Sequence, residues 1–323
     1  MAVYTDVPRT DLDAFVSRFD IGAVLSCEPI AEGIENSNYL LTTATGRYIL
    51  TLYEARVAPA DLPYFVALMD HLAGCGFPCP LPVRDRSGEA LHRLAGKPAA
   101  IVTFLEGTWP REPTAAHCRA LGTATARLHM AGQFFALSRP NDLSVNAWRP
   151  IYTPLKEQAR AFGPAFGRRV EDELAFLEEY WPHDLPEGVI HADLFPDNVF
   201  FRDGRLSGII DFYFACTDCL VYDLAVCLNA WCFGPGGAFR PLHSAALFEG
   251  YQELRPLLPV EIDSLPVLAR GAALRFLLTR LHDWFLPQGD ALTRRKDPRD
   301  LLPIASFHRG VSDSAAYGID CPA

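Results

Sequence analysis

Between residues 20 and 54 apolar and polar positions first alternate and then give way to apolar runs, in three segments that are typical of strands. Turn-forming residues at 32–36 and 43–46 separate these segments and predict hairpins. Similar segments at 90–94 and 98–105, joined by a glycine-containing turn, predict two further strands. We therefore expect the first third of the chain to form an antiparallel sheet of about five strands.

A helical period appears once within this region and dominates after it. Apolar residues at spacings of three and four between Pro59 and Gly74 predict one helix. Beyond residue 106, helices are predicted at 114–130, 170–180, 222–232, 243–254 and 262–286. The pattern predicts an α+β fold with two lobes. The N-terminal lobe, residues 1–106, would be an antiparallel sheet with one main helix, and the C-terminal lobe, residues 107–323, would be mostly helical.

Composition narrows the class of protein. Half of the residues are apolar and 21% are charged, which argues against disorder, and the net charge of −10 argues against a nucleic-acid partner. No segment approaches the roughly 18 apolar residues of a membrane span, and residues 1–15 do not resemble a signal peptide. The cysteines, including the pair Cys216 and Cys219, are expected to be reduced thiols rather than zinc ligands. We expect a cytoplasmic protein with no membrane partner, and its oligomeric state is left open.

A segment of strands and turns within the helical half, residues 189–214, carries the candidate chemistry. It contains His191, Asp193 and Asn198, then a hairpin turn, and then Asp211 at the end of an apolar strand. Phosphoryl transfer needs a residue that orients and deprotonates the attacking hydroxyl, together with oxygen ligands for a metal ion. Asp193 is predicted to be that base, and Asn198 and Asp211 are predicted to bind Mg²⁺. His191 is expected to hold the loop backbone.

The combination of these residues supports the interpretation more than any one of them does. A His-x-Asp sequence alone is most often a surface turn. Here Asn198 follows Asp193 by five positions, and Asp211 follows Asn198 by thirteen, with apolar strands on either side. Such an arrangement is improbable by chance, and it predicts a phosphotransferase that uses ATP and Mg²⁺.

The sequence His-x-Asp-x-x-x-x-Asn followed by Ile-Asp-Phe resembles the catalytic motif of the aminoglycoside phosphotransferase and choline kinase superfamily, which has a protein-kinase-like fold. Within it, the chain resembles the homoserine kinases of threonine biosynthesis. This similarity covers nearly the whole chain and rests on residues 33–39, 48–54, 78–80, 191–198, 210–216, 222–225 and 228–233. It implies transfer of the γ-phosphate of ATP to the hydroxyl of L-homoserine, giving O-phospho-L-homoserine. It also implies that Asp223, at a helix start, braces the catalytic loop.

The resemblance further implies how the N-terminal lobe binds ATP. Residues 102–107 would form a hinge that binds adenine through backbone groups, and the turn after the first strand would cover the phosphates. The nucleotide contacts that follow are Gly33, Asn36, Ser37, Thr51, Thr103, Phe104 and Leu105. Related kinases carry a lysine at the position of Thr51, paired with a glutamate from the next helix, and both are absent here. Arg47, Arg56 and Lys97 are open candidates for the missing cation.

L-Homoserine presents an ammonium, a carboxylate and a hydroxyl to its binding site. The carboxylate needs a guanidinium that can pair with both oxygens, and Arg275 and Arg280 lie on an otherwise apolar predicted helix. The candidate partners of the ammonium are Asp218, Asp283 and Asp193 itself. Tyr213, Asn229 and Trp231 are candidate walls of the pocket, although aromatic residues at these positions could equally belong to the core. Another acceptor, such as choline, an aminoglycoside or a sugar-like metabolite, is the first alternative. A nucleotide-binding pseudokinase without turnover, suggested by the missing lysine, is the second.

Overall fold

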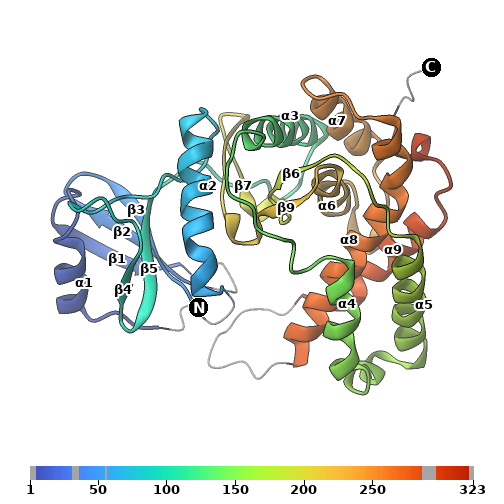
Figure 1. Cartoon of the computed structure of the whole chain (residues 1–323), viewed down its shortest axis with the longest axis horizontal. Coiled ribbons are helices and arrows are strands. Elements are labelled where there is room, and N and C mark those ends of the chain that lie inside the picture. Colours follow the sequence, from blue (N-terminus) through green and yellow to red (C-terminus); the bar gives the residue numbers. More distant parts are fainter. Residues whose placement is uncertain (1–4, 31–35, 55–56, 286–295, 320–323) are drawn as a thin grey trace. The chain divides into compact units, whose positions relative to one another are not determined.

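A computed structural model of the chain describes residues 5–30, 36–54, 57–285 and 296–319 (Figure 1). The chain divides into two compact units. The first unit contains residues 1–106, 208–213 and 287–294, and the second contains residues 107–207, 214–286 and 295–323. The first unit thus includes Asp211, which the predicted lobes assign to the C-terminal one.

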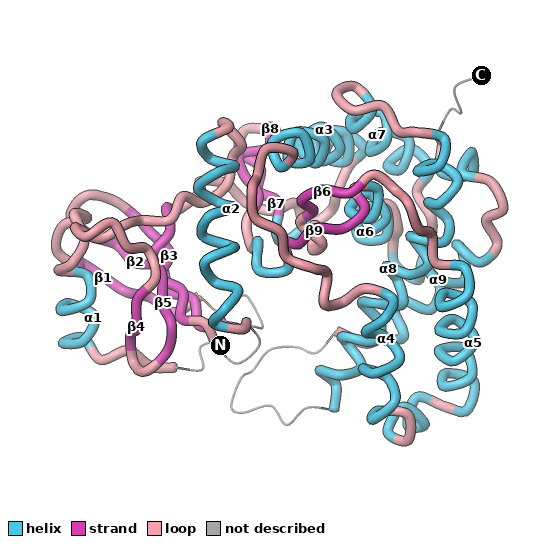
Figure 2. Tube along the Cα trace, viewed as in Figure 1, coloured by secondary structure: helices cyan, strands magenta, loops and turns pink. Residues whose placement is uncertain are grey.

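The described part of the first unit is built on a five-stranded sheet in the order β1-β2-β3-β5-β4 (Figure 2). The strands are β1 (Val24–Pro29), β2 (Ser37–Thr43), β3 (Arg47–Leu52), β4 (His92–Leu94) and β5 (Lys97–Thr103). Each neighbouring pair is antiparallel. The predicted antiparallel sheet is therefore confirmed, with its strand ends displaced by a few residues at most sites, as is usual for boundaries read from a pattern.

Two helices, α1 (Arg9–Val16) and α2 (Leu62–Gly74), lie on opposite sides of this sheet (Figure 1). Leu50 and Leu52 of β3 are fully buried in the core that α1 covers. Thr51, which lies between them, faces the other side of the sheet, because successive side chains of a strand alternate between its faces. The two faces of β3 therefore have different roles, apolar packing toward α1 and polar contacts away from it.

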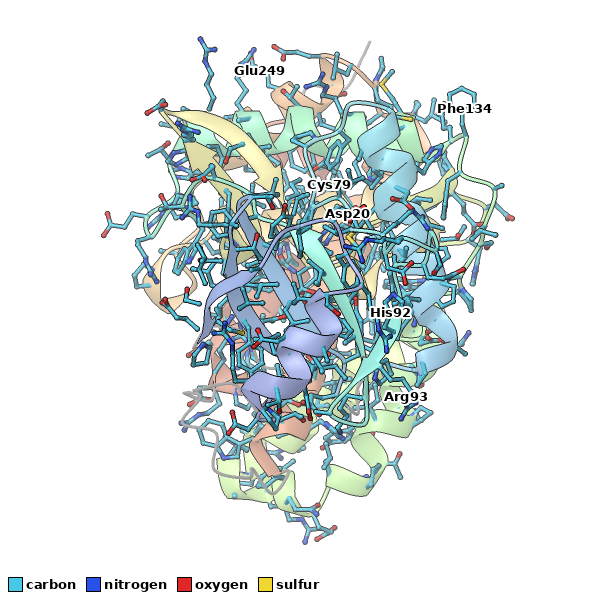
Figure 3. All side chains as sticks on the ribbon, turned by 90° about the vertical axis from the view of Figure 1, so that its left-hand side faces the viewer. Asp20, Cys79, His92, Arg93, Phe134 and Glu249 are labelled. Atoms are coloured by element: carbon cyan, nitrogen blue, oxygen red, sulfur yellow. The ribbon has the colours of Figure 1, made fainter. Side chains whose placement is uncertain are left out.

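Helix α1 was not predicted from the sequence. Its eight residues bury Leu12, Phe15 and Val16, a repeat too short for a helical period to stand out. The helix is held by packing on the sheet: Figure 3 looks onto α1 and labels His92 of β4, whose ring lies edge-on to that of Phe15 of α1, with centroids 6.0 Å apart. Tertiary contacts rather than local propensity thus explain this helix.

The described part of the second unit is mostly helical. Its α-helices are α3 (Ala115–Gly132), α4 (Val145–Tyr152), α5 (Pro164–Tyr180), α6 (Val221–Trp231), α7 (Pro241–Gln252), α8 (Pro259–Phe285) and α9 (Leu302–Arg309). Two short strand pairs accompany them, β6 (Glu187–Ile190) with β9 (Cys216–Cys219), and β7 (Val199–Arg202) with β8 (Arg205–Ile209). Helices α4 and α9 were not predicted, and the other five were. None of the described helices combines the length and apolar character that a membrane crossing requires.

Helices α3 and α7 pack closely enough to exclude side chains at two glycines. A Cβ atom at Gly122 of α3 would lie 2.0 Å from the Leu247 carbonyl oxygen, and one at Gly250 of α7 would lie 2.1 Å from the Arg119 carbonyl oxygen. The two helix backbones therefore touch at these points. Because the backbones touch, Tyr251 of α7 can reach His129 of α3, a contact that is described with the active site below.

A buried histidine fixes α9 to the rest of the second unit. His308 is 2% exposed, its Nε2 lies 2.7 Å from Asn229 Oδ1 on α6, and its Nδ1 lies 2.8 Å from the Tyr317 hydroxyl. Asn229 in turn donates to the Ala269 carbonyl on α8 at 2.8 Å. Burial lowers the pKa of His308 to about 3. The ring is therefore neutral, donating to Asn229 and accepting from Tyr317.

This histidine makes the stability of the protein depend on pH. In the unfolded chain His308 binds a proton below a pH of about 6.5, whereas in the folded protein it does so only near 3. Between these values the unfolded state binds more protons, so the free energy of unfolding falls by about 1.4 kcal/mol for each unit of falling pH from this group. We expect urea unfolding between pH 4 and 7 to show that contribution in the wild type and to lose it in His308→Gln. His183→Gln, at an exposed histidine, is the matched control and should keep it.

Candidate active site

The loop between β6 and β7 holds the predicted base and metal ligand of the second unit in one hydrogen-bonded turn. Asn198 donates through Nδ2 to the Asp193 carbonyl at 2.8 Å and to Asp193 Oδ2 at 2.9 Å. The Asp193 amide donates to His191 Nδ1 at 3.2 Å. His191 is fully buried, and its role in holding the loop stays a prediction that this hydrogen bond supports. Because its amide nitrogen donates to Asp193, the side-chain oxygen of Asn198 is the atom left for the predicted metal.

Asp223, in the first turn of α6, anchors the start of this loop. Its Oδ2 accepts from the His191 amide at 2.8 Å and its Oδ1 accepts from the Ala192 amide at 2.7 Å. These bonds hold Ala192 at a φ of +61°, a left-handed conformation that a residue with a side chain seldom adopts. Burial raises the pKa of Asp223, but hydrogen bonds and charge from His129 and the His191 amide outweigh it and hold the pKa below its ordinary value. The carboxylate is therefore ionised and braces the loop, as predicted.

A chain of buried polar groups behind Asp223 was not predicted. His129 of α3 lies with Nε2 3.1 Å from Asp223 Oδ2 and with Nδ1 2.8 Å from the Tyr251 hydroxyl of α7. Arg255 donates to the same hydroxyl at 3.1 Å and lies 3.0 Å from Glu261 Oε1. Each group in this chain can donate to the next, from Arg255 to Asp223. The sequence signal was weak, because a histidine and a tyrosine on apolar helix faces are usually core residues.

The carbonyl groups of the loop are held from α6 and α8. Trp231 Nε1 donates to the Leu194 carbonyl at 2.8 Å. Arg275 is 2% exposed and donates through Nη1 to the Ala192 carbonyl. Its guanidinium lies over the Phe276 ring, 4.4 Å from the centroid, and its Nε is buried without a hydrogen-bond partner in the described part of the chain. Arg275 thus contacts this loop and has one buried N–H group without a partner in the described part of the chain.

Asp211, the second predicted metal ligand, belongs to the first unit. It lies between β8 and the short 3₁₀-helix Phe212–Phe214, with a φ of +66°. A left-handed backbone is strained for a residue with a side chain, so it persists only where the surroundings hold it in place. Such residues are found most often at functional sites. Among the described residues no three histidine, cysteine, aspartate or glutamate side chains form a metal cluster. The pairing of Asp211 with Asn198 on one metal ion stays a prediction.

The predicted nucleotide contacts lie in the first unit, apart from Gly33, which falls outside the described residues. Asn36 Oδ1 accepts from the Glu54 amide at 3.2 Å, which ties the residue before β2 to the segment after β3. Thr103 accepts from the Leu81 amide at 2.9 Å. Beyond Thr103, no described group bonds to the backbone of Phe104 or Leu105, so their N–H and C=O groups are available for adenine. The contacts themselves stay predictions.

Two of the three candidate cations have partners. Lys97 Nζ lies 2.9 Å from Glu54 Oε2. Arg47 pairs with Glu106 and lies over the Phe104 ring, 4.3 Å from its centroid. The third candidate, Arg56, lies outside the described residues.

The other predicted substrate contacts lie in separate surroundings. Asp218 of β9 accepts from Asn141 at 2.7 Å and from the Cys219 amide at 2.7 Å. Arg280 lies near Asp197, Asp297 and Asp300, and burial lowers the pKa of its guanidinium. Tyr213 belongs to the first unit, where its hydroxyl lies 3.1 Å from that of Tyr53. Their shared role in one pocket stays a prediction.

Comparison with known proteins decides the family. The profile of the phosphotransferase enzyme family matches residues 26–257. The chain belongs to this family. A homoserine kinase of Methylobacterium nodulans is 56% identical over 318 residues, which is 98% of this chain and 99% of that protein. A homoserine kinase of Parvibaculum lavamentivorans is 53% identical over 320 residues, covering 99% of this chain and 100% of that protein.

Solved structures agree on the fold. An amicoumacin kinase in complex with AMP-PNP, Ca²⁺ and Ami superposes with a TM-score of 0.69 over 93% of each chain at 14% identity. A microcompartment-associated aminopropanol kinase superposes with a TM-score of 0.64 over 94% of this chain and 97% of its own, at 17% identity. At such identities the likeness concerns the fold alone. The predicted α+β, kinase-like fold is confirmed, and so is the resemblance to homoserine kinases.

Proposed function

We propose that this phosphotransferase transfers the γ-phosphoryl group of ATP to the hydroxyl of L-homoserine, giving O-phospho-L-homoserine for threonine biosynthesis in the cytoplasm. The observation that carries the proposal is the extent of the similarity to homoserine kinases. These relatives are 52–56% identical to the chain, and each alignment covers 98% or 99% of it. The catalytic loop supplies the chemistry that such a reaction needs.

Asp193 accepts the proton of the attacking hydroxyl in this proposal. Its carboxylate is half-buried and receives a hydrogen bond from Asn198, which fixes the direction in which the remaining lone pairs point. Asn198 Nδ2 also donates to the backbone carbonyl of Asp193, so the backbone and the side chain of Asp193 cannot turn independently. Asp193 therefore meets the hydroxyl in one orientation, which reduces the entropy cost of reaching the transition state.

The donor set fits Mg²⁺. Asn198 offers an amide oxygen and Asp211 a carboxylate, and hard oxygen ligands of this kind, completed by phosphate oxygens and water, are what Mg²⁺ prefers. When bound, the ion neutralises charge on the phosphates. The chain's own contribution is to aim the Asn198 oxygen, which follows from the hydrogen bonds of its nitrogen to Asp193.

Arg275 is our choice for the partner of the homoserine carboxylate. Its Nε is a buried donor without a partner in the described chain, beside the loop that carries Asp193. The charge of Arg280 is instead partly balanced by Asp197, Asp297 and Asp300, which disfavours an added anion there. Asp218 is the proposed partner of the ammonium, and Tyr213 stays a proposed wall of the pocket. Pairing of Arg275 with the homoserine carboxylate would set the distance from the homoserine hydroxyl to Asp193.

Turnover of ATP with a panel of acceptors tests the proposal. With Mg²⁺ present, we expect ADP release with L-homoserine and not with choline, kanamycin, methylthioribose or buffer alone. Turnover with a different acceptor would preserve the phosphotransferase assignment and reject homoserine. ATP binding without turnover on any acceptor would favour a pseudokinase.

The role of Arg275 has a specific test. Arg275→Lys keeps the positive charge but loses the guanidinium group, which can pair with both carboxylate oxygens. We expect kcat/KM for L-homoserine to fall by about 10- to 100-fold, because a hydrogen bond to a charged group is lost. The comparison acceptor is 2-amino-1,4-butanediol, which has the ammonium and hydroxyl but no carboxylate. With this diol the wild type and the variant should differ much less. Equal losses on both acceptors would show that Arg275 acts only by holding the Ala192 carbonyl, and Arg280→Lys would then be compared in the same way.

A further inference from the structure

The strand position where related kinases carry a lysine is occupied by Thr51, and its side chain bonds across the sheet. Thr51 of β3 pairs with Asn38 of β2 in the antiparallel register. Its hydroxyl donates to Asn38 Oδ1 at 2.8 Å. Thr51 is 2% exposed, whereas Asn38 is half-buried. The threonine is therefore enclosed, and the asparagine is the member of the pair that a ligand can reach.

Two tyrosines of the first unit contact each other. The Tyr213 hydroxyl lies 3.1 Å from the Tyr53 hydroxyl. Its ring packs edge-on against Tyr53, with centroids 5.1 Å apart, and against Phe65 of α2 at 5.7 Å. Tyr213 follows Asp211 by two residues, so the segment that carries the predicted metal ligand packs on the same face of the sheet as Thr51.

The Thr51 hydroxyl fixes the orientation of the Asn38 amide. It donates its one proton to Asn38 Oδ1. The amide is then fixed with Nδ2 pointing away from β3. No described residue accepts a hydrogen bond from that nitrogen, so it is a prepared donor.

Lys97 lies on the face of the sheet opposite to Thr51. Its partner Glu54 also accepts from Ser37 at 2.8 Å and from Thr5 at 2.7 Å. On β2, Ser37 is next to Asn38 and therefore points to the opposite face of the sheet. On β5, Lys97 is two positions from Ala99 and therefore points to the same face as Ala99, which packs in the core under α1. Side chains alternate between faces, so this ion pair lies on the side of the sheet away from Thr51.

Arg47 is on the correct face of β3 but at its far end. It precedes Thr51 by four residues, a separation of about 13 Å along a strand. There it pairs with Glu106 and lies over Phe104, in the segment predicted to bind adenine. Neither described cation therefore lies beside Thr51.

We propose that the Asn38 side-chain amide donates a hydrogen bond to a phosphate oxygen of ATP, in place of the strand lysine, and that Thr51 positions it. The inference rests on the proposed use of ATP. It accounts for two absences at once: a neutral amide held by a hydroxyl needs no glutamate, and α2 supplies none. Thr51 is a positioning residue here, acting through Asn38 rather than on the nucleotide itself.

Binding measurements on nucleotides with and without phosphates test the inference. Isothermal titration calorimetry would compare ATP with Mg²⁺, without an acceptor, against adenosine. For Asn38→Ala we expect the Kd of ATP to rise about 10- to 100-fold, as for a lost hydrogen bond to a charged group. The Kd of adenosine should stay within about twofold, because the amide touches only phosphate.

Two further variants separate positioning from packing. Thr51→Val removes the hydroxyl at nearly constant volume, and we expect it to raise the Kd of ATP about 3- to 10-fold while Thr51→Ser restores it. Thr42→Val, at a half-buried position on the same face of β2, is the matched control and should leave both affinities unchanged.

The inference fails if Asn38→Ala binds ATP as the wild type does. It also fails if adenosine affinity falls as much as ATP affinity, since that result indicates damage to the whole unit. Homoserine turnover is a separate measurement. A wild type that binds ATP but does not phosphorylate homoserine would reject the proposed substrate, and the ATP and adenosine comparison would still decide the role of Asn38.

Discussion

Asp193→Asn is expected to lower kcat for homoserine phosphorylation by about 100- to 10,000-fold, the range that a positioned general base contributes. The replacing carboxamide has nearly the same shape and can still accept the hydrogen bond from Asn198, so the loop should keep its conformation. It does not accept the proton of the attacking hydroxyl. The loss should therefore appear in kcat at saturating substrates, while the Kd of ATP changes by no more than about twofold.

The same substitution at Asp203 is the matched control. Asp203 lies in the exposed turn between β7 and β8 with a φ of +51°, a conformation that asparagine adopts readily. Asp203→Asn should retain full activity. A loss of less than tenfold in Asp193→Asn would mean that another group removes the proton, and a large rise in the Kd of ATP would mean that the carboxylate acts on the nucleotide.

The catalytic loop could be predicted because its chemistry is contiguous in the sequence. Asp193 and Asn198 lie on one short turn, and the spacing that brings them together is visible without the fold. His129 could not be predicted in this way, since it contacts Asp223 across 94 positions and its surroundings in the sequence are those of an ordinary apolar helix. The sequence shows which residues have reactive groups, but only tertiary packing shows which distant side chains hold them.

The cations illustrate the same limit. In the sequence, Lys97 is a plausible substitute for the missing lysine, because it is one of few basic residues near the sheet. The register of β3 with β5 places Lys97 on the face opposite to Thr51. Leu52 pairs with Ala99, so Lys97 lies on the α1 face beside Glu54. Alternation along each strand was visible from the beginning, but the pairing of strands was not. Arg275 is a similar case, since its contact with Ala192 spans 83 positions.

Asp223→Asn is expected to destabilise the protein by about 2 to 4 kcal/mol and to slow catalysis. The wild-type carboxylate accepts from the amides of His191 and Ala192 and contacts His129, all within the buried interior. An asparagine supplies one acceptor oxygen and turns an NH₂ group toward a second donor, which leaves a buried N–H unsatisfied at a cost of about 1–3 kcal/mol. It also removes the charge that complements the hydrogen-bond chain from His129.

Ala192 gives the reason that catalysis should also suffer. Its left-handed backbone is maintained by the hydrogen bond to Asp223, and it is followed directly by Asp193. Relaxation of that strain would move the base, and a displacement of about 1 Å at a reacting group can cost about 100-fold in rate. We therefore expect kcat to fall at least tenfold, at a temperature where urea unfolding shows the variant to be folded.

Glu173→Gln separates the two effects. Glu173 is a 7% exposed acid of the same unit that pairs with Arg270, on α5 and away from the loop. Its substitution also removes a buried charge, so it should lower the free energy of unfolding while leaving kcat unchanged. If both variants lose activity in proportion to their stability, Asp223 is a stabilising residue only. If Asp223→Asn alone loses activity, the bracing of Ala192 by a carboxylate 31 residues away is part of how this fold keeps its base in place.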